Sequence, residues 1–397
     1  MTEVSPPKPS VRRVLAAVSI IAFATALFSR AVDPIIPQIA KDLMVTPETV
    51  ALLSTGFALP FALVQPVLGP FADIIGKPRV MIACLIILII AAFVGSITTS
   101  FPLLLMTRIV AGMATGGVFP VALALVGDLV PVAERQVALG RYLAMVITGN
   151  LMGLSLAGFV GDLIGWRGVF VVAGLCGITA FIAALAGFRG AQHLSQAKTF
   201  SLATMLSGYR TVFANPRAKV CYAAVFLEGL AVFGLFPYVA LLMHLRGEER
   251  ASIAGLVLAG FAIGGIGYSF IVPMMLRRFT LGTIMIMGGG IAAISLAGFA
   301  LIVPWPVTLG IFALFGFGFY TLHGSIQVQA TELAPDARGA AVALHAFFFF
   351  VGQGTGPVLY GFGFANMDAA FTLAFGAAII LFVGFFCSRL LGPAKAE

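Results

Sequence analysis

Apolar stretches of about 18 or more residues recur from one end of this 397-residue chain to the other. Only 10% of the residues are charged, 60% are hydrophobic, and the mean hydropathy is +1.09. A water-soluble protein of this length needs more polar surface than that. In lipid, each segment must satisfy its own backbone hydrogen bonds, and these stretches are too long and too uniformly apolar for barrel strands. The sequence therefore predicts an all-α membrane protein.

Twelve such stretches are joined by short connections, except for a longer polar stretch at 189–218 that separates two sets of six. The expected spans are 14–38, 48–70, 79–98, 102–129, 138–161, 168–188, 219–243, 252–275, 281–301, 305–330, 339–362 and 369–391. The expected domains are a cytoplasmic tail (1–13), a six-helix bundle (14–188), a cytoplasmic linker (189–218), a second six-helix bundle (219–391) and a cytoplasmic tail (392–397).

The basic residues gather on one side of the expected membrane. The termini, the linker, the connections after spans 2, 4, 8 and 10 and the span ends that adjoin them hold 17 of the 23 Lys and Arg residues, and the opposite connections hold four. The positive-inside rule places the termini in the cytoplasm. The net charge of +8 is thus a sign of orientation, and we expect no nucleic-acid partner. The expected location is a bacterial-type cytoplasmic (inner) membrane.

The two halves resemble each other at an offset of about 203 residues. Gly149–Gly153 in span 5 corresponds to Gly352–Gly356 in span 11, and Pro34 corresponds to Pro237. Internal repeats of this kind are typical of transporter folds, in which the substrate binds between the halves near the middle of the membrane. We therefore predict two pseudo-symmetric six-helix bundles with a site between them.

The connection between spans 2 and 3 reads GPFADIIGKPRV (69–80). By itself it is a polar turn with inside-positive charges. Its pattern Gly-x-x-x-Asp-x-x-Gly-[Arg/Lys]-x-[Arg/Lys] resembles the signature loop of the major facilitator superfamily, and the twelve spans, the linker and the repeats agree with that fold. The resemblance implies that the loop acid pairs with a basic residue and with an acid at the end of span 4, locking the outward-open state. The implied switch residues are Gly69, Asp73, Gly76, Lys77, Arg79 and Asp128.

Small residues at four-residue spacing give several spans a flat face for close helix contact. In span 5 the pattern resembles the Gly-x-x-x-Gly-Pro-x-x-x-Gly motif of the drug:proton antiporters in the superfamily, with Leu154 in place of the proline. This departure weakens the expectation of antiport but leaves the fold unchanged. The expected helix-packing residues are Gly112, Gly116, Gly149, Gly153, Gly158, Gly352, Gly356 and Pro357.

Charged residues deep in apolar spans are costly and by default mark functional sites. Asp33 precedes two prolines, which break the helix and expose backbone carbonyls beside the acid. Arg108 lies about 9 Å into span 4 by helical rise, at a depth similar to that of Asp33. The two can face each other if spans 1 and 4 are neighbours, as in the resembled family. There, the arginine of an Arg-x-x-x-Gly motif assists proton coupling. Arg30 receives no role from the sequence.

Glu228 lies near the middle of span 7 among apolar residues. We take it, with Asp33 and Arg108, as a candidate for proton coupling. The alternative is a protonated, hydrogen-bonded carboxyl that only joins helices. His323 and His345, in the cytoplasmic halves of spans 10 and 11, are interpreted as structural.

Asn150 and Gln353 occupy related mid-depth positions in the two halves. With Phe236 and Tyr320, they are expected to line the substrate cavity. The alternative for the two amides is that they only tie helices together.

The sequence contains no P-loop, no Cys/His metal spacing and no nucleophile elbow, so we expect neither an enzyme nor a cofactor or metal. The leading hypothesis is a secondary active transporter that exports drugs or small amphipathic metabolites by proton antiport and alternating access. The alternative is an uptake symporter, facilitator or exchanger of a small polar metabolite, such as a sugar or organic anion. A membrane enzyme or receptor is the least supported class. The expected partners are the lipid bilayer, a small-molecule substrate and protons, and we expect a monomer.

Overall fold

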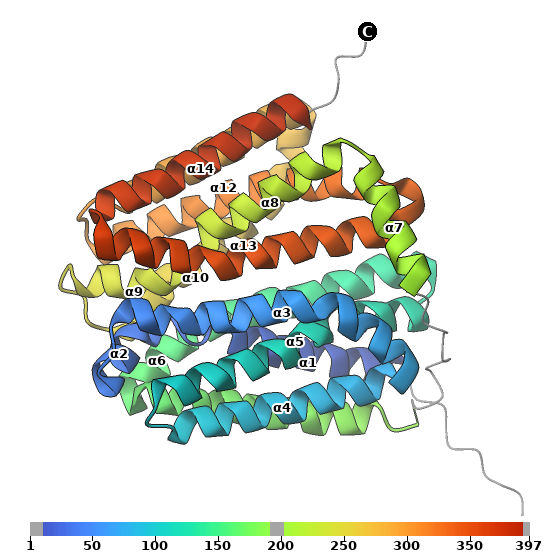
Figure 1. Ribbon diagram of the computed structural model, residues 1–397, viewed down its shortest axis with the longest axis horizontal. Helices are drawn as coiled ribbons and strands as arrows, with labels where there is room; N and C mark the ends of the chain where they lie inside the picture. The colour runs from blue at the N-terminus through green and yellow to red at the C-terminus, as the bar shows by residue number, and fades with distance from the viewer. Residues whose placement is uncertain (1–10, 191–201, 392–397) are drawn as a thin grey trace, which may run out of the picture.

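A computed structural model describes residues 11–190 and 202–391. Within these ranges the side chains of 69–70, 73, 132–133, 136 and 202–205 lie outside the description. All regular structure in the described residues is helical, and eleven of their helical segments are long and apolar enough to cross a membrane. The helices of the first half lie together along one side of the molecule, and those of the second half lie along the other (Figure 1). The predicted all-α class is confirmed.

The first half consists of long helices that pack in pairs. Its described elements are α1 (Val11–Arg30), the 3₁₀ turn η1 (Asp33–Ile35), α2 (Ile36–Leu43), α3 (Pro47–Ile75), α4 (Lys77–Ile97), α5 (Phe101–Leu129) and α6 (Val132–Gly187). α1 packs along α6, α3 along α5, and α4 against both α5 and α6. Thr46 begins α3 by accepting a hydrogen bond from the backbone N–H of Thr49 at 3.2 Å, and Pro47 takes the first helical position, where no N–H is needed.

The second half repeats this pattern of pairing. Its described elements are α8 (Arg217–Phe233), α9 (Phe236–His244), α10 (Ala251–Arg278), α11 (Leu281–Gly298), α12 (Trp305–Glu332), the 3₁₀ turn η3 (Pro335–Ala337), α13 (Arg338–Asn366) and α14 (Ala369–Leu390). α8 packs along α13, α10 along α12, and α11 against α12 and α14. The helices of each half thus pair in the same order along the chain, as the sequence repeat predicts.

The first span of each half is broken at its proline. In span 1, α1 ends at Arg30, and η1, which contains Pro34, leads into α2. The predicted break is therefore present. Span 7, expected at 219–243, is divided in the same way, because α8 ends at Phe233 and α9 begins at Phe236, just before Pro237. A proline has no N–H to donate to the preceding turn, so the same kink recurs at the repeat-related position.

Spans 5 and 6 are joined in α6, but they are separated by Gly165, which has φ 77° and ψ 171°. This left-handed φ favours glycine and allows the chain to reverse direction between the two spans. The expected linker at 189–218 contains a helix, α7 (Leu202–Ala214), that was not predicted from the sequence. Residues 191–201 of this linker, the expected tail 392–397 and most of the tail 1–13 lie outside the described residues.

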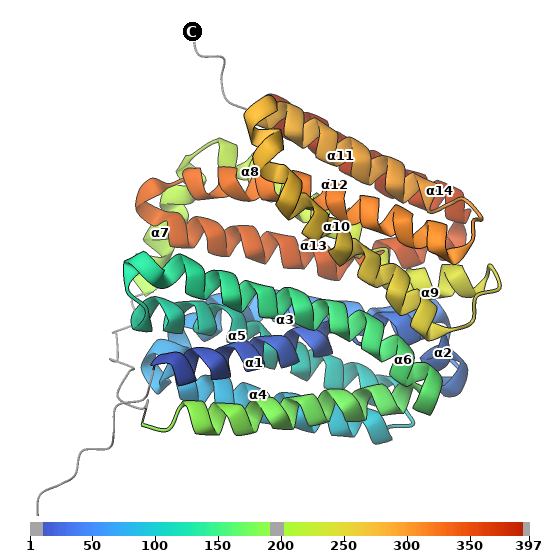
Figure 2. The same ribbon diagram turned by 180° about the vertical axis from the view of Figure 1, so that it is seen from behind.

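The two halves meet along a seam made by two pairs of helices. α3 lies against α13 (Figure 1), and α6 lies against α10 (Figure 2). α7 and both ends of the described chain lie at one end of the molecule, which we call the linker end (Figure 1). α2 and α9 lie at the opposite end, which we call the distal end.

Candidate functional site

Arg108 holds the end of the broken helix α1. The side chain is fully buried on α5 and donates to the backbone oxygens of Phe28 and Ser29, each at 3.1 Å. These carbonyls belong to the last turn of α1, where a helix end leaves them without backbone donors. Arg108 interacts electrostatically with Asp33, but among the described residues its hydrogen bonds go to this turn and not to the carboxylate. The expected approach of the two residues is thus present without a direct ion pair.

Asp33 lies in η1, immediately after the break, and only 1% of it is exposed. Its Oδ1 accepts a hydrogen bond from the Ser54 hydroxyl on α3 at 2.7 Å. Its Oδ2 lies 3.7 Å from Nη1 of Arg30 and has no hydrogen-bond partner among the described residues. The carboxylate is therefore firmly held on one side and loosely paired on the other.

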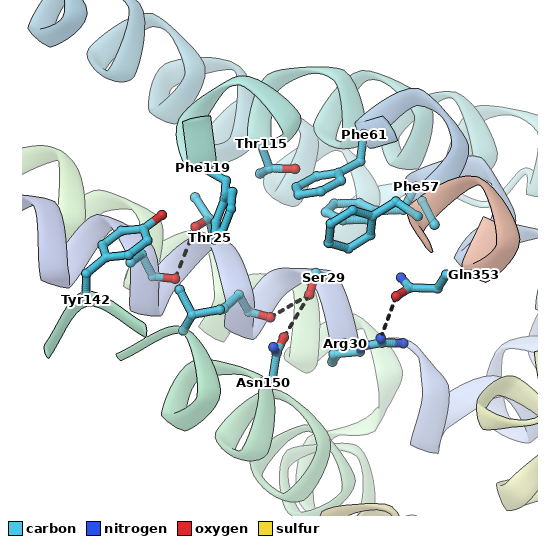
Figure 3. Close-up of a pocket in the computed structure, with 15 residues that line it drawn as sticks. Thr25, Ser29, Arg30, Phe57, Phe61, Thr115, Phe119, Tyr142, Asn150 and Gln353 are labelled. Carbon is cyan, nitrogen blue, oxygen red and sulfur yellow. Dashed lines mark hydrogen bonds between the residues drawn. The ribbon is translucent and has the colours of Figure 1, made fainter. Parts of the chain in front are cut away.

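Arg30, which received no role from the sequence, connects the two halves. Its Nη2 donates to Oε1 of Gln353 on α13 at 3.1 Å (Figure 3). Its guanidinium lies 4.5 Å from the ring centroid of Phe233 and 5.2 Å from that of Phe236. Cation–π contacts of this kind hold a guanidinium in place while leaving some of its N–H groups available.

Two adjoining central cavities lie at the seam and share Arg30, Asn150, Phe350 and Gln353 in their walls. The first has a volume of about 110 Å³, and aromatic side chains of the first half surround it (Figure 3). The second has a volume of about 210 Å³ and is lined by aromatic side chains of the second half. All four residues expected in a substrate cavity line the second one: Asn150, Phe236, Tyr320 and Gln353.

A third cavity of about 580 Å³, which we call the vestibule, lies toward the linker end. It shares Phe119 with the first central cavity, and Tyr209 of α7 and Arg338 of α13 form part of its wall. The cavities therefore form a series from the linker end to the middle of the molecule.

The distal end is closed by contacts across the seam. Both carboxylate oxygens of Asp162 on α6 accept hydrogen bonds from the first turn of α10, from the backbone N–H groups of Ala251 and Ser252, each at 2.9 Å. A Cβ on Gly158 would meet the backbone oxygen of Ala251. The departure at Leu154 also lies on this seam, because a Cβ on Gly255 would meet its carbonyl oxygen.

Glu228 forms a second buried polar cluster within the second half. Its Oε2 lies 2.8 Å from Nδ1 of His323, whose ring lies 5.2 Å from that of His345, centroid to centroid. Glu228 is fully buried, whereas His323 lines the second central cavity. The imidazole therefore stands between the cavity and the carboxyl group, a position from which it can pass a proton.

The switch loop is partly described. Lys77 is buried and donates to Oδ2 of Asp128 at 2.8 Å, while Arg79 lies on the exposed side of α4. The side chain of Asp73 lies outside the described residues, as does Gly69. The resemblance ties this network to an outward-open state, but here the Lys77–Asp128 pair coexists with a closed distal end.

The expected helix-packing residues lie at helix contacts. At each of the seven glycines among them, a Cβ would meet a backbone oxygen of the partner helix, so only glycine permits that spacing. Gly112 and Gly116 bring α5 onto α3, Gly149 and Gly153 bring α6 onto α1, and Gly352 and Gly356 bring α13 onto α8. The carbonyl oxygen of Pro357 accepts a hydrogen bond from the Tyr238 hydroxyl at 2.7 Å.

The sequence singles out Asp33, Arg108, Glu228 and Gln353, but it does not predict that Arg30 contacts Gln353 or that His323 contacts Glu228. Arg30 and Gln353 are 323 positions apart, and Glu228 and His323 are 95 apart. Contacts between residues so far apart in the sequence produce no periodic pattern that could predict them. The only available signal was that Arg30 and His323, like the acids, are polar residues inside apolar spans.

Charged residues buried in apolar helices, around cavities at the seam of two matching halves, define an integral multi-pass membrane protein of the transporter class. The chain belongs to the Major Facilitator Superfamily, whose family model matches residues 18–357. Membership of this family makes the chain a membrane transporter and not an enzyme.

Similar proteins cover most of the chain. The quinolone resistance protein NorA of Staphylococcus aureus (strain MRSA252) is 24% identical and covers 88% of this chain and 89% of its own length. The uncharacterized MFS-type transporter YfhI of Bacillus subtilis (strain 168) is also 24% identical, and the match covers 85% of this chain and 84% of that protein. The crystal structure of the nucleoside transporter NupG has a TM-score of 0.78 at 13% identity, and the match covers 97% of this chain and 100% of that one. An inward-facing bacterial homolog of the human lysosomal transporter Spinster has a TM-score of 0.73 at 19% identity, over 98% and 100%.

Proposed function

We propose that the chain is a proton-coupled secondary transporter that moves amphipathic small molecules through the central cavities by alternating access. The observation that carries this proposal is the composition of the cavity walls. Aromatic rings of both halves surround a small polar set that includes Arg30, Asn150 and Gln353. A site with mostly apolar walls and few polar groups binds molecules that are largely apolar and carry one polar group.

The arrangement corresponds to an inward-facing state, with the termini and linker in the cytoplasm of a bacterial-type inner membrane. The excess of Lys and Arg at the linker end supports this orientation. The vestibule lies toward that end, while the Asp162 contacts close the distal end. Opening the distal end would require the halves to separate along α6 and α10, the rigid-body motion expected of a protein built from repeats.

Two buried acids are our candidates for carrying the proton. Asp33 pairs with Arg30, which in turn donates to Gln353, so the charge of Asp33 affects a contact between the two halves. Glu228 reaches the cavity through His323. A proton on either carboxyl group changes the charge buried beside the central cavities, and so can favour one arrangement of the halves over the other.

The first candidate for the direction of transport is export by antiport. It is supported by the relatives named as quinolone resistance proteins, since a transporter can confer drug resistance by export. The glycine pattern of span 5, which resembles that of drug:proton antiporters, supports it further.

The second candidate is transport of an organic anion together with a proton. One observation favours it: among the described residues that line the two central cavities, Arg30 is the only one with a permanent charge.

Proteoliposomes containing the purified chain test the proposal. A pH gradient is imposed, and the movement of three probes with the same ring system but different charge is followed: 2-naphthoate, 2-naphthamide and 2-naphthylmethylamine. We expect at least one probe to accumulate, and a protonophore to abolish this. Movement against the proton flow supports antiport, and movement with it supports co-transport. If none of the probes responds to the gradient, the proposal is wrong.

The same assay examines the proton site. Asp33→Asn removes the titratable group with little change in shape. We expect gradient-driven transport to fall about tenfold, a typical size for the coupling between two bound ligands. Asp42→Asn is the matched control, because Asp42 pairs with Arg167 at the distal end, away from the cavities. Unchanged coupling in Asp33→Asn would remove Asp33 from the mechanism.

A further inference from the structure

We infer that the substrate of the central cavities is an amphipathic organic anion, whose carboxylate-type group binds Arg30 in competition with the carboxylate of Asp33. This inference rests on the proposed function only in taking the central cavities as the transport site. It selects the organic anion from the two candidates above and adds that this anion and Asp33 compete for Arg30.

The charged groups in the cavity walls favour a negatively charged substrate. Among the described residues lining the vestibule and both central cavities, the permanent charges are those of Arg338 and Arg30, and both are positive. The carboxyl groups of Asp33 and Glu228 lie behind the walls, and neither residue lines these cavities. A cationic substrate would therefore meet no carboxylate among these described residues, whereas an anion would find a guanidinium at the inner end of the path.

The buried charges near the seam have an excess of positive charge. Arg30, Arg108 and Asp33 interact electrostatically, so two guanidinium groups share one carboxylate. Arg108 is already held by the carbonyls of α1. An unbalanced charge inside an apolar bundle is unfavourable, and a bound anion would neutralise it. The site is thus electrostatically incomplete without a negative ligand.

The contacts of Arg30 leave some of its N–H donors available to a ligand. A guanidinium has five N–H donors in a planar fork that matches a carboxylate, and one nitrogen here is bonded to Gln353. The 3.7 Å between Arg30 Nη1 and Asp33 Oδ2 exceeds the about 2.7–2.9 Å of a strong charge-assisted bond. Arg30 is therefore oriented by the second half but only loosely neutralised by Asp33, which leaves donors for an incoming anion.

Aromatic side chains place the rest of such a ligand. Phe233 and Phe236 stack against the guanidinium, and Phe61 and Phe350 form an edge-to-face pair at the first central cavity, 4.6 Å between centroids. An aromatic ring joined to a carboxylate can rest on these side chains while its charged end reaches Arg30.

Competition for Arg30 links the anion to the proton. The polar groups that face Asp33 are Arg30 of α1, Ser54 of α3 and Arg108 of α5. Protonation of Asp33 removes its hold on Arg30, so anion binding and protonation should favour each other. Of the two directions proposed above, this linkage supports co-transport of anion and proton.

Binding to the purified full chain in lipid nanodiscs tests the inference independently of transport. Isothermal titration at neutral pH compares 2-naphthoate with 2-naphthamide and 2-naphthylmethylamine. We expect the carboxylate to bind at least about tenfold more tightly than the amide, as for one charge-assisted interaction. Arg30→Gln should abolish that preference. Asp33→Asn should tighten naphthoate binding and leave the affinity for the amide unchanged, because only the anion competes with Asp33.

Arg389→Gln is the matched control, since it removes one positive charge from an exposed position on α14. If Arg30→Gln does not fold, Arg30→Lys, which keeps the charge but loses the fork, and Asp33→Asn carry the test. The inference is overturned if naphthoate binds no better than the amide or the amine, or if Asp33→Asn weakens it. Selective naphthoate binding without movement of any probe in proteoliposomes would instead contradict the proposed function.

Discussion

At the scale of single residues, the three buried candidates are satisfied in different ways. Arg108 donates hydrogen bonds to the carbonyls of a helix end, Asp33 accepts one from a hydroxyl group and lies 3.7 Å from a guanidinium, and Glu228 lies 2.8 Å from an imidazole nitrogen. The Arg108 contacts are structural in character, because they complete the last turn of α1. Each of the two acids has one oxygen without a hydrogen bond among the described residues, and this leaves room for a change of protonation.

Glu228→Gln tests the cluster in the second half. The amide can still bond to His323, but it cannot accept a proton. We expect gradient-driven transport in proteoliposomes to fall about tenfold while exchange of substrate for substrate continues, because exchange needs no net proton movement. Glu332→Gln, at an exposed position at the end of α12, is the control. Equal losses of exchange and gradient-driven transport would indicate a structural role, which is the alternative reading of this carboxyl group.

At the scale of elements, two devices shape the helices. Prolines break the first span of each half and free carbonyls beside the cavities, and glycines let paired helices approach until backbone meets backbone. The break of span 1 was predicted because an acid and two prolines coincide there. The break of span 7 was missed because its proline has no charged neighbour, although the repeat offset already pointed to Pro237.

The glycine contacts can be tested by adding one methyl group. A Cβ at position 112 would meet the backbone oxygen of Phe57, which cannot move as a side chain can, whereas a Cβ at Gly290 would meet nothing within 4 Å. We expect Gly112→Ala to destabilise the protein by about 1–3 kcal/mol, as overpacking does, and Gly290→Ala to have little effect. Thermal unfolding in detergent measures both. A Gly112→Ala variant as stable as Gly290→Ala would show that α3 and α5 are not held at this spacing.

At the scale of the whole molecule, the halves are held together at the distal end and separated by cavities toward the linker end. The Asp162 carboxylate joins α6 to the first turn of α10, where it also meets the positive end of the helix dipole. The sequence did not single out Asp162, because it follows a glycine stripe near the end of a span and looks like an ordinary boundary residue. Its partner lies 89 positions away.

Asp162→Asn should favour opening of the distal end. The change removes the charge and one of the two accepting oxygens, and a loss of about 1.4 kcal/mol would shift the population of closed molecules about tenfold. Spin labels at Met44→Cys and Ile302→Cys, which replace exposed residues of the first and second halves, report the distance by pulsed electron paramagnetic resonance. Asp368→Asn, which also precedes a helix but makes no side-chain cap, is the control. An unchanged distance distribution would exclude Asp162 as a closing contact.

The sequence by itself determined the membrane solvent, the helical class, the repeated halves, the glycine faces and the break at Asp33. These follow from composition and from spacing along one helix, because an apolar environment leaves a backbone few alternatives. The tertiary structure decided which charges meet: Arg108 with the end of α1, Arg30 with Gln353, and Glu228 with His323. Only the Arg30–Gln353 pair crosses the seam, and the other two lie within one half. Such pairing depends on which helix faces turn toward one another, so side chains far apart in the chain meet only after the helices have packed.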